Sequence, residues 1–276
     1  MKPLLTVYEK AMPGNLTWRD KLLAAKKAGF DGVEISIDET EEKLSRLDWT
    51  PEQRHELLDL TRETGTCVLT MCLSGHRKYP LGSRDPQTVR RGLEIARKAI
   101  DFASDVGIRI IQLAGYDVYY EQSSQDTCIR FQENLKKVVE MAARKGIVLG
   151  FETMETPFMN TVAKAMLYVK GIDSPYLQIY PDVGNICNGT EDAVADLQTG
   201  SGHIVAAHLK ETVPGIFRDM HYGEGAVDFP LLTSVLKLQG VGIYNAEFWY
   251  SSSYKDGDWQ GALKEAHDFL RPLLED

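Results

Sequence analysis

Hydrophobic and polar positions along the chain follow two alternating patterns. Short apolar or β-branched runs, such as residues 32–37, alternate with longer stretches in which apolar residues recur every three or four positions. The first pattern is typical of buried strands and the second of helices that cover them. A glycine separates a helical stretch from the next strand at several places, which predicts a left-handed cap at the end of each helix. These glycines are Gly29, Gly65, Gly107, Gly146, Gly171 and Gly240.

The pattern predicts eight strand–helix units. Strands are expected at Leu4–Tyr8, Gly32–Ile37, Cys67–Leu73 and Ile108–Leu113, and at four further runs that end at Glu152, Asp182, His208 and Glu247. Helices are expected at Trp18–Ala28, from Thr50, from Asp85 to Val106, at about 126–145, 159–170, 190–200 and 229–239, and from about 258. Eight units in 276 residues predict an α/β fold, a TIM (β/α)8 barrel that forms a single domain over residues 1–276. A doubly wound sheet would need a glycine-rich phosphate turn after the first strand, and residues 9–14 do not form one.

Four successive predicted strands end in a residue that can bind a metal: Glu152, Asp182, His208 and Glu247. For one such glutamate alone a salt bridge would be the simpler explanation, because buried charges are usually paired. In a parallel barrel, however, all strands end on the same face, so the four side chains are expected to converge on one divalent cation. Three carboxylates and one imidazole, without thiolates, suit Zn²⁺ or Mn²⁺.

Glu152 and Glu247 could lie on opposite faces of a flat substrate bound at this ion. Removal of a proton next to a carbonyl requires a base within reach and a stabilised oxygen, and a metal can stabilise that oxygen as a Lewis acid. One glutamate would then remove the proton and the other would return it from the opposite side through a metal-stabilised enediolate, which is an epimerisation. The residues alone indicate such a metal site but do not fix the reaction.

Several segments carry a family resemblance. They are Tyr8-Glu9-Lys10-Ala11, Arg46-Leu47-Asp48-Trp49, Met71-Cys72-Leu73-Ser74, Pro80-Leu81-Gly82-Ser83, residues 110–120, Tyr180-Pro181-Asp182-Val183-Gly184-Asn185 and Gly223-Glu224-Gly225. On these segments the chain resembles, over nearly its whole length, the L-ribulose-5-phosphate 3-epimerases. These are also described as L-xylulose-5-phosphate 3-epimerases of L-ascorbate utilisation or as hexulose-6-phosphate isomerases, and they are xylose-isomerase-like TIM barrels.

The resemblance implies an isomerase that inverts C3 of a ketopentose phosphate and interconverts L-ribulose 5-phosphate and L-xylulose 5-phosphate. It implies one metal ion held by the four strand-end residues, with Glu152 and Glu247 as the acid/base pair, and it suggests a homodimer. Free-sugar 3-epimerases have a histidine three residues after the metal aspartate, where this chain has Asn185. This difference favours a different set of substrates, which is consistent with a phosphorylated sugar.

A phosphorylated sugar needs cationic side chains at the mouth of the barrel. The candidates are His76, Arg77 and Lys78 after the third strand, and Lys210 and Arg218 after the seventh. Lys210 follows His208 by two positions, so strand alternation directs both to the same side. The other candidates could equally be solvated surface charges.

Three more polar residues are candidates near the site. Asn185 and Glu155 could contact substrate, although Glu155 could instead cap a helix. Glu34 in the second strand could support the metal ligands or bind substrate.

The composition excludes several classes of protein. A net charge of −9 and a pI near 5.3, without a basic tract, argue against a partner that is nucleic acid or an anionic membrane. The sequence has neither an apolar run of about 20 residues nor a signal-peptide pattern, and its four cysteines form no CxxC pair. These features predict a reduced, soluble, cytoplasmic protein.

Three other functions remain open on this scaffold. An aldose–ketose isomerase or other sugar-phosphate isomerase would use a similar site. An endonuclease of this fold would need more histidines and a basic face. A catalytically inactive sugar-phosphate sensor would not need two opposed glutamates.

Overall fold

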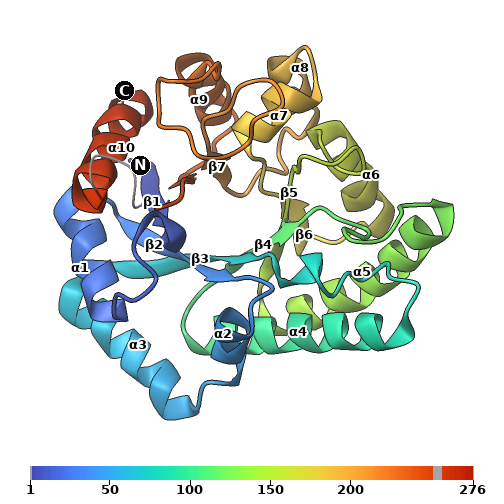
Figure 1. Ribbon diagram of the computed structural model, residues 1–276. Coiled ribbons are helices and arrows are strands. Elements are labelled where there is room, and N and C mark those ends of the chain that lie inside the picture. Colours follow the sequence, from blue (N-terminus) through green and yellow to red (C-terminus); the bar gives the residue numbers. More distant parts are fainter. Residues whose placement is uncertain (1, 251–256, 276) are drawn as a thin grey trace.

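The strands of the protein form a ring that the helices surround (Figure 1). The computed structural model describes residues 2–250 and 257–275. The strands are β1 (Leu4–Tyr8), β2 (Gly32–Ile37), β3 (Cys67–Leu73), β4 (Ile110–Ala114), β5 (Val148–Glu152), β6 (Leu177–Ile179), β7 (Ala207–Leu209) and β8 (Ile243–Ala246). They form one eight-stranded sheet in the order β6-β5-β4-β3-β2-β1-β8-β7, and all paired strands are parallel.

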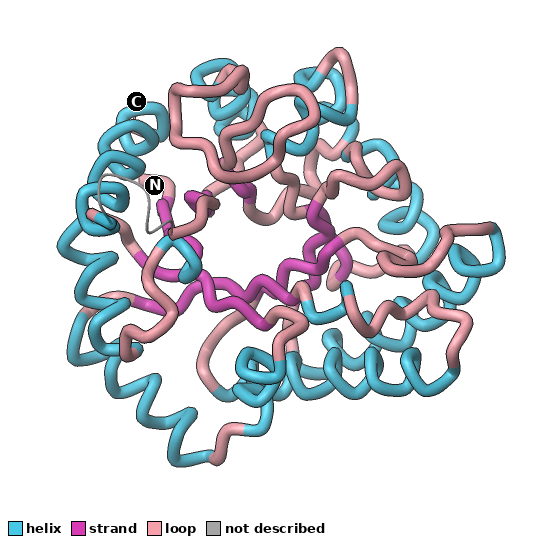
Figure 2. The backbone as a smooth tube through the Cα atoms, viewed as in Figure 1, coloured by secondary structure: helices cyan, strands magenta, loops and turns pink. Residues whose placement is uncertain are grey.

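The two ends of this sheet meet and close the ring, as Figure 2 shows. The parallel bridges Ile179↔Ile204 and Asp182↔His208 join the segments that contain β6 and β7. Hydrogen bonds from Ile179 N to His203 O (2.9 Å) and from His208 N to Pro181 O (2.9 Å) support these bridges. The predicted TIM barrel is confirmed.

The helices cover the outside of the ring. They are α1 (Trp18–Ala28), α2 (Glu41–Leu44), α3 (Pro51–Thr64), α4 (Pro86–Asp105), α5 (Gln125–Lys145), α6 (Val162–Ile172), α7 (Val183–Gly189), α8 (Ala193–Thr199), α9 (Phe229–Leu238) and α10 (Trp259–Leu274). Short 3-10 helices lie at Glu9–Ala11, Ser45–Asp48 and Gly75–Arg77. The eight predicted helices are present, whereas α2, α7 and the 3-10 turns were not predicted.

The predicted left-handed glycine caps occur at five of the six positions. Gly29, Gly65, Gly107, Gly146 and Gly240 have φ of 105°, 68°, 83°, 66° and 81°. The prediction for Gly171 is wrong, because this residue lies inside α6 and Asp173 takes the left-handed conformation, with φ of 52°. The aspartate ends the helix here by donating its backbone N–H to Val169 O at 2.9 Å.

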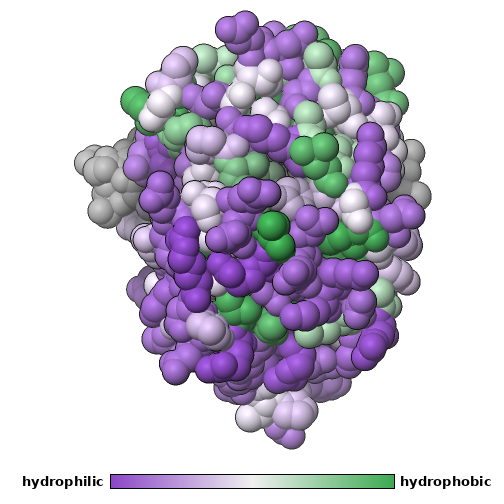
Figure 3. Space-filling model, turned by 90° about the vertical axis from the view of Figure 1, so that its right-hand side faces the viewer, coloured by the Kyte–Doolittle hydropathy of each residue, from purple (hydrophilic) through white to green (hydrophobic). Residues whose placement is uncertain are grey.

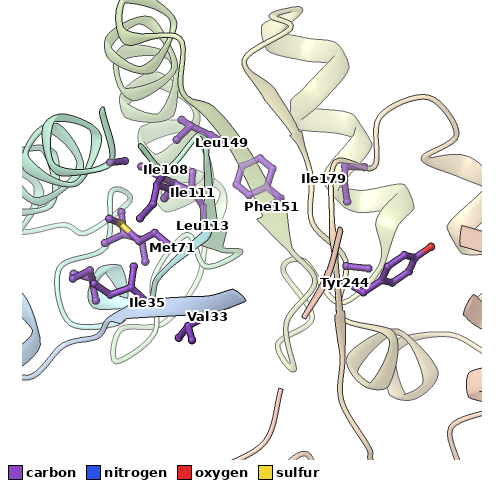
Figure 4. Close-up of a cluster of buried hydrophobic side chains, with 14 of the residues drawn as sticks. Val33, Ile35, Met71, Ile108, Ile111, Leu113, Leu149, Phe151, Ile179 and Tyr244 are labelled. Atoms are coloured by element: carbon purple, nitrogen blue, oxygen red, sulfur yellow. The ribbon is translucent and has the colours of Figure 1, made fainter. Parts of the chain in front are cut away.

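Alternate residues along each strand face two different environments. One set is apolar and packs between the ring and the helices, as the labelled side chains in Figure 4 illustrate. The other set faces the inside of the barrel and is largely polar; Thr6, Glu34, Thr70, Gln112 and Asn245 are all buried there. Buried polar groups must be paired, so this interior is held by hydrogen bonds between strands.

A second buried polar cluster lies where β1 ends. The carboxylate of Glu9 is ion-paired with Lys21 (3.1 Å), Lys43 (2.7 Å) and Arg46 (2.6 Å). It also accepts a hydrogen bond from the backbone of Ser36 (2.9 Å). Burial tends to raise the pKa of Glu9, but the charges of Arg46, Lys21 and Lys43 outweigh it and lower the pKa from 4.5 to about 2.

Glu9→Gln should lower the free energy of unfolding at neutral pH by about 3–5 kcal/mol, because three buried cations lose the buried anion that they share. The folded-state pKa lies below the ordinary value, so the carboxylate stabilises the fold above pH 4.5 and loses this effect as the pH falls towards 2. Thermal unfolding of both proteins across this range tests the idea. A difference between variant and wild type that does not shrink with acid would contradict it.

One face of the outer surface is mostly hydrophilic. Figure 3 shows the side on the right of Figure 1, where hydrophobic side chains lie in small separate groups among hydrophilic ones. None of the described helices is both long and apolar enough to cross a membrane.

Candidate metal centre

The four predicted metal ligands converge at one end of the barrel. Glu152, Asp182, His208 and Glu247 each offer one ligand atom, and these atoms all lie within 4.8 Å of one another. All four side chains are buried. These residues are far apart in the sequence but meet in space, because β5, β6, β7 and β8 follow one another around the closed ring.

The strand ends position these side chains. Glu152 is the last residue of β5, His208 lies in the middle of β7, and Glu247 follows β8 directly. Asp182 lies between β6 and α7, where its Oδ1 caps the helix by accepting the N–H of Asn185 at 2.8 Å. The cap leaves Oδ2 of Asp182 directed at the other ligands.

His208 lies at the centre of the cluster. Its Nδ1 is 3.0 Å from Oε1 of Glu152 and 3.0 Å from Oε2 of Glu247. Its other ring nitrogen, Nε2, is 2.8 Å from Oε1 of Glu34. One nitrogen therefore faces the two strand-end glutamates, and the opposite nitrogen faces the barrel interior.

The buried oxygens of the cluster fit a divalent cation. Within the described part of the chain, the partners of Oδ2 of Asp182 and Oε2 of Glu247 are ionic. The ammonium of Lys210 lies 2.7 Å from the first and 3.6 Å from the second. Buried carboxylate oxygens that lack hydrogen bonds are costly unless a cation compensates them. Three carboxylates and an imidazole nitrogen are ligands that Zn²⁺ and Mn²⁺ accept.

The charges of the cluster shift its pKa values in different directions. Burial is the main cause that raises the pKa of Glu152, and the charge of Glu247 adds to it. Burial also raises the pKa of Asp182 well above its usual value, although the charge of Lys210 acts in the opposite direction. Burial opposes the charged form of Glu247 too, but Lys210 and His208 hold its pKa well below the usual range. Burial likewise disfavours protonated His208 and Lys210, whose pKa values are nevertheless raised by the surrounding carboxylates. The site is thus strongly suited to positive charge.

A pocket opens above the cluster, and most of the residues predicted to contact substrate line it. It is lined by Tyr8, Lys10, Cys72, Ser74, Arg77, Glu152, Met154, Glu155, Asn185, Lys210, Phe217, Arg218, Glu247 and Trp249. A wider groove lies elsewhere, between α1 and α3, and its lining from Arg19 to Glu63 contains no member of the cluster. The pocket above the metal ligands is therefore the candidate active site.

Asn185 and Lys210 lie deep in this pocket. The amide nitrogen of Asn185 donates to Thr153 O at 2.7 Å, and its Oδ1 accepts no hydrogen bond from the described residues. A buried amide oxygen in this state can accept a hydroxyl proton from a bound molecule. Lys210, which is ion-paired with Asp182, can donate to substrate oxygens at the same depth.

Arg77, Glu155 and Arg218 lie on the lining farther from the ligands. The Arg77 guanidinium packs over Tyr119 at 4.9 Å, and its buried Nε has no acceptor among the described residues. Glu155 accepts the hydroxyl of Tyr116 at 2.8 Å. The Arg218 guanidinium lies 4.9 Å from the Trp249 ring.

His76 is not brought to the pocket. Its ring is buried, and Nε2 lies 3.0 Å from Gly92 O on α4. Burial lowers the pKa of His76 despite this contact. The side chain therefore packs against a helix on the outside of the ring, and it is not among the residues that line the pocket. Lys78 is also outside the lining and lies 3.6 Å from Glu41.

Sequence reasoning missed one residue that holds the cluster. Gln112 of β4 is buried, and its amide donates a hydrogen bond to Oε2 of Glu152. The available signal was a glutamine inside the apolar run 110–114, at an inward position of the strand. Lys10 on the pocket lining was also not predicted to contact substrate.

Comparison with known proteins identifies the family of the chain. The family described as xylose isomerase-like TIM barrel matches residues 22–273. The chain is 50% identical to L-ribulose-5-phosphate 3-epimerase UlaE of Escherichia coli over 271 residues, which cover 98% of this chain and 94% of that protein. The chain belongs to the L-ribulose-5-phosphate 3-epimerase family. UlaE of Salmonella heidelberg is also 50% identical, over 89% of this chain and 87% of that protein.

The family resemblance expected from the sequence is confirmed, and with it the isomerase class of the enzyme. A solved structure of D-psicose 3-epimerase with D-tagatose from Clostridium cellulolyticum H10 has a TM-score of 0.84 with 17% identity and covers 100% of both chains. At this identity the likeness concerns the fold.

Proposed function

We propose that this protein is a metal-dependent epimerase that inverts C3 of L-ribulose 5-phosphate and L-xylulose 5-phosphate. The name of its 50% identical relatives supports the substrate. The observation that carries the chemistry is the arrangement of two glutamates around His208. Glu152 and Glu247 come from β5 and β8, with β6 and β7 between them, and each brings an oxygen to 3.0 Å from His208 Nδ1.

One divalent ion per chain, Zn²⁺ or Mn²⁺, would be held by Glu152, Asp182, His208 and Glu247. When bound, it would supply Lewis acidity to the carbonyl and hydroxyl oxygens next to C3. The two glutamates have the proton-transfer role. One takes the C3 proton from one face of the sugar, and the other delivers a proton to the opposite face, so that the configuration is inverted.

Other pocket residues hold the sugar during this transfer. Lys210 donates to the oxygens on which negative charge develops, since its ammonium already lies beside Asp182 and Glu247. The open Oδ1 of Asn185 accepts a proton from a sugar hydroxyl. Glu155, fixed by Tyr116, is placed to accept from a hydroxyl farther along the chain.

The phosphate would lie at the outer end of the pocket, near Arg77 and Arg218. Arg77 packs against the rings of Tyr116 and Tyr119 and has an unused buried donor, which makes it suitable for binding a phosphate. Arg218 approaches from the loop after β7. His76, packed on Gly92, is left out of this subsite. The homodimer and the cytoplasmic location stay predictions.

The test is incubation of the metal-loaded enzyme with L-ribulose 5-phosphate in heavy water. We expect L-xylulose 5-phosphate to form, with deuterium at C3 detected by NMR. Unphosphorylated L-ribulose is the matched control and should react poorly. An aldose product would indicate an aldose–ketose isomerase, and binding without any exchange would indicate an inactive sensor; either result would overturn the proposal.

A further inference from the structure

We propose that Glu34 is a positioning residue that fixes which nitrogen His208 presents to the metal; this inference rests on the metal site of the proposed function. Glu34 lies on β2 with 0% of its surface exposed. It belongs neither to the ligand cluster nor to the pocket lining. Its Oε1 lies 2.8 Å from His208 Nε2, so that ring connects it to the ligand cluster.

Four donors saturate the Glu34 carboxylate. Oε1 accepts from His208 Nε2 (2.8 Å) and from the amide of Asn245 (2.9 Å). Oε2 accepts from the hydroxyls of Thr70 (2.8 Å) and Tyr180 (3.0 Å). A carboxylate accepts at all four places, whereas an amide would bring an NH₂ group against two of these donors. The surroundings are therefore built for a carboxylate.

The partners of Glu34 are themselves fixed. Thr6 donates to Oδ1 of Asn245 at 2.8 Å, and this orients the Asn245 amide so that its nitrogen faces Glu34. The Tyr180 ring lies edge-on to the His208 ring, with centroids 4.7 Å apart. The acceptor for Nε2 thus has a single position in the barrel interior.

This geometry decides the tautomer of His208. Because Nε2 must carry the proton that Glu34 accepts, Nδ1 is left to face Glu152 and Glu247 with its lone pair available to a cation. A half-turn of the ring would place a carbon against Glu34 and lose the hydrogen bond. A carboxylate behind a ligating histidine also makes the imidazole a better ligand.

A purely structural role for Glu34 makes a different prediction. It would tie β2 to its neighbours, so its loss would lower the stability of the metal-free protein and leave its affinity for metal unchanged. A positioning role requires that the affinity itself falls. The test therefore measures both quantities on the same variants.

Glu34→Gln should bind Mn²⁺ about 10- to 100-fold more weakly than wild type by isothermal titration of metal-free protein. The control is Asp117→Asn, which also removes a buried carboxylate that accepts from hydroxyls, those of Ser123 and Thr127, but lies outside the cluster and the pocket lining. This control should keep the wild-type affinity whatever its melting temperature. Wild-type affinity in Glu34→Gln would overturn the assignment. If wild type itself bound neither Mn²⁺ nor Zn²⁺, the proposed metal site would fail first and this inference with it.

A second measurement needs no Glu34 variant and holds even if that variant does not fold. In Zn²⁺-loaded, ¹⁵N-histidine-labelled wild type, the His208 ring should carry its proton on Nε2, with its signal assigned by loss in His208→Gln. A proton on Nδ1 would exclude the proposed role of Glu34.

Discussion

Glu152→Gln and Glu247→Gln should each lower the rate of C3 epimerisation by about 10³- to 10⁴-fold or more, to the limit of detection. Glutamine keeps the shape of the side chain and can still coordinate through oxygen, but it cannot take up or deliver the proton. Since inversion requires one proton transfer on each face of the sugar, the remaining glutamate cannot complete the reaction alone.

The two variants should differ in the half-reaction that they retain. The glutamate that remains can still remove the C3 proton from the epimer that presents it on the correct face. In heavy water, therefore, one variant should exchange C3 of L-ribulose 5-phosphate and the other that of L-xylulose 5-phosphate, each without forming the other epimer. NMR of the recovered sugars measures this directly.

A matched control separates proton transfer from a general effect on the pocket. Glu155→Gln changes another pocket glutamate, which accepts from Tyr116 and is outside the ligand cluster. It should change KM more than kcat. The metal content of all three variants must be measured, since Glu152 and Glu247 are also proposed as ligands. Substantial epimerisation by either metal-loaded cluster variant would refute the two-base scheme.

The sequence predicted that the four candidate ligands lie together, because their positions depend on where strands end. In a parallel barrel the strand ends share one face, so Glu152 and Glu247 could be placed together without any knowledge of loop structure. The glycine caps were predictable because they depend on a local pattern, a helical stretch followed by a glycine and a strand. Gly171 was the exception, because Lys170-Gly171-Ile172 has the same pattern as the true caps while α6 continues through it to Ile172.

Contacts across the ring could not be predicted, since they depend on the order and tilt of the strands. Glu34 and His208 are 174 positions apart and meet only because the barrel closes. The position of His76 also depended on tertiary packing, as α4 offers Gly92 O to its ring. Helix α7 was not predicted because Asp182 was considered only as a metal ligand. In the structure Oδ1 of Asp182 caps the helix, and Oδ2 faces Lys210 in the site.

Removal of the metal should abolish epimerisation, and Zn²⁺ or Mn²⁺ should restore it. Without an ion, Lys210 and His208 are the described residues that balance the buried carboxylates of Asp182 and Glu247. Chelator-treated enzyme should therefore lose activity and melt at a lower temperature, because an ion at 1,000 times its Kd would contribute about 4 kcal/mol to the folded state.

His208→Ala should retain much less metal than wild type after dialysis, with affinity reduced by more than about 100-fold. It removes the single nitrogen ligand, and the loss should exceed that caused by changes behind a ligand. His203→Ala is the control, because His203 lies near the start of the same segment and contacts Gln178 at 3.0 Å, outside the pocket lining. Elemental analysis of the three proteins decides the matter. Equal metal in wild type and His208→Ala would mean that the ion lies elsewhere, and the positions of Glu152 and Glu247 about His208 would then need another explanation.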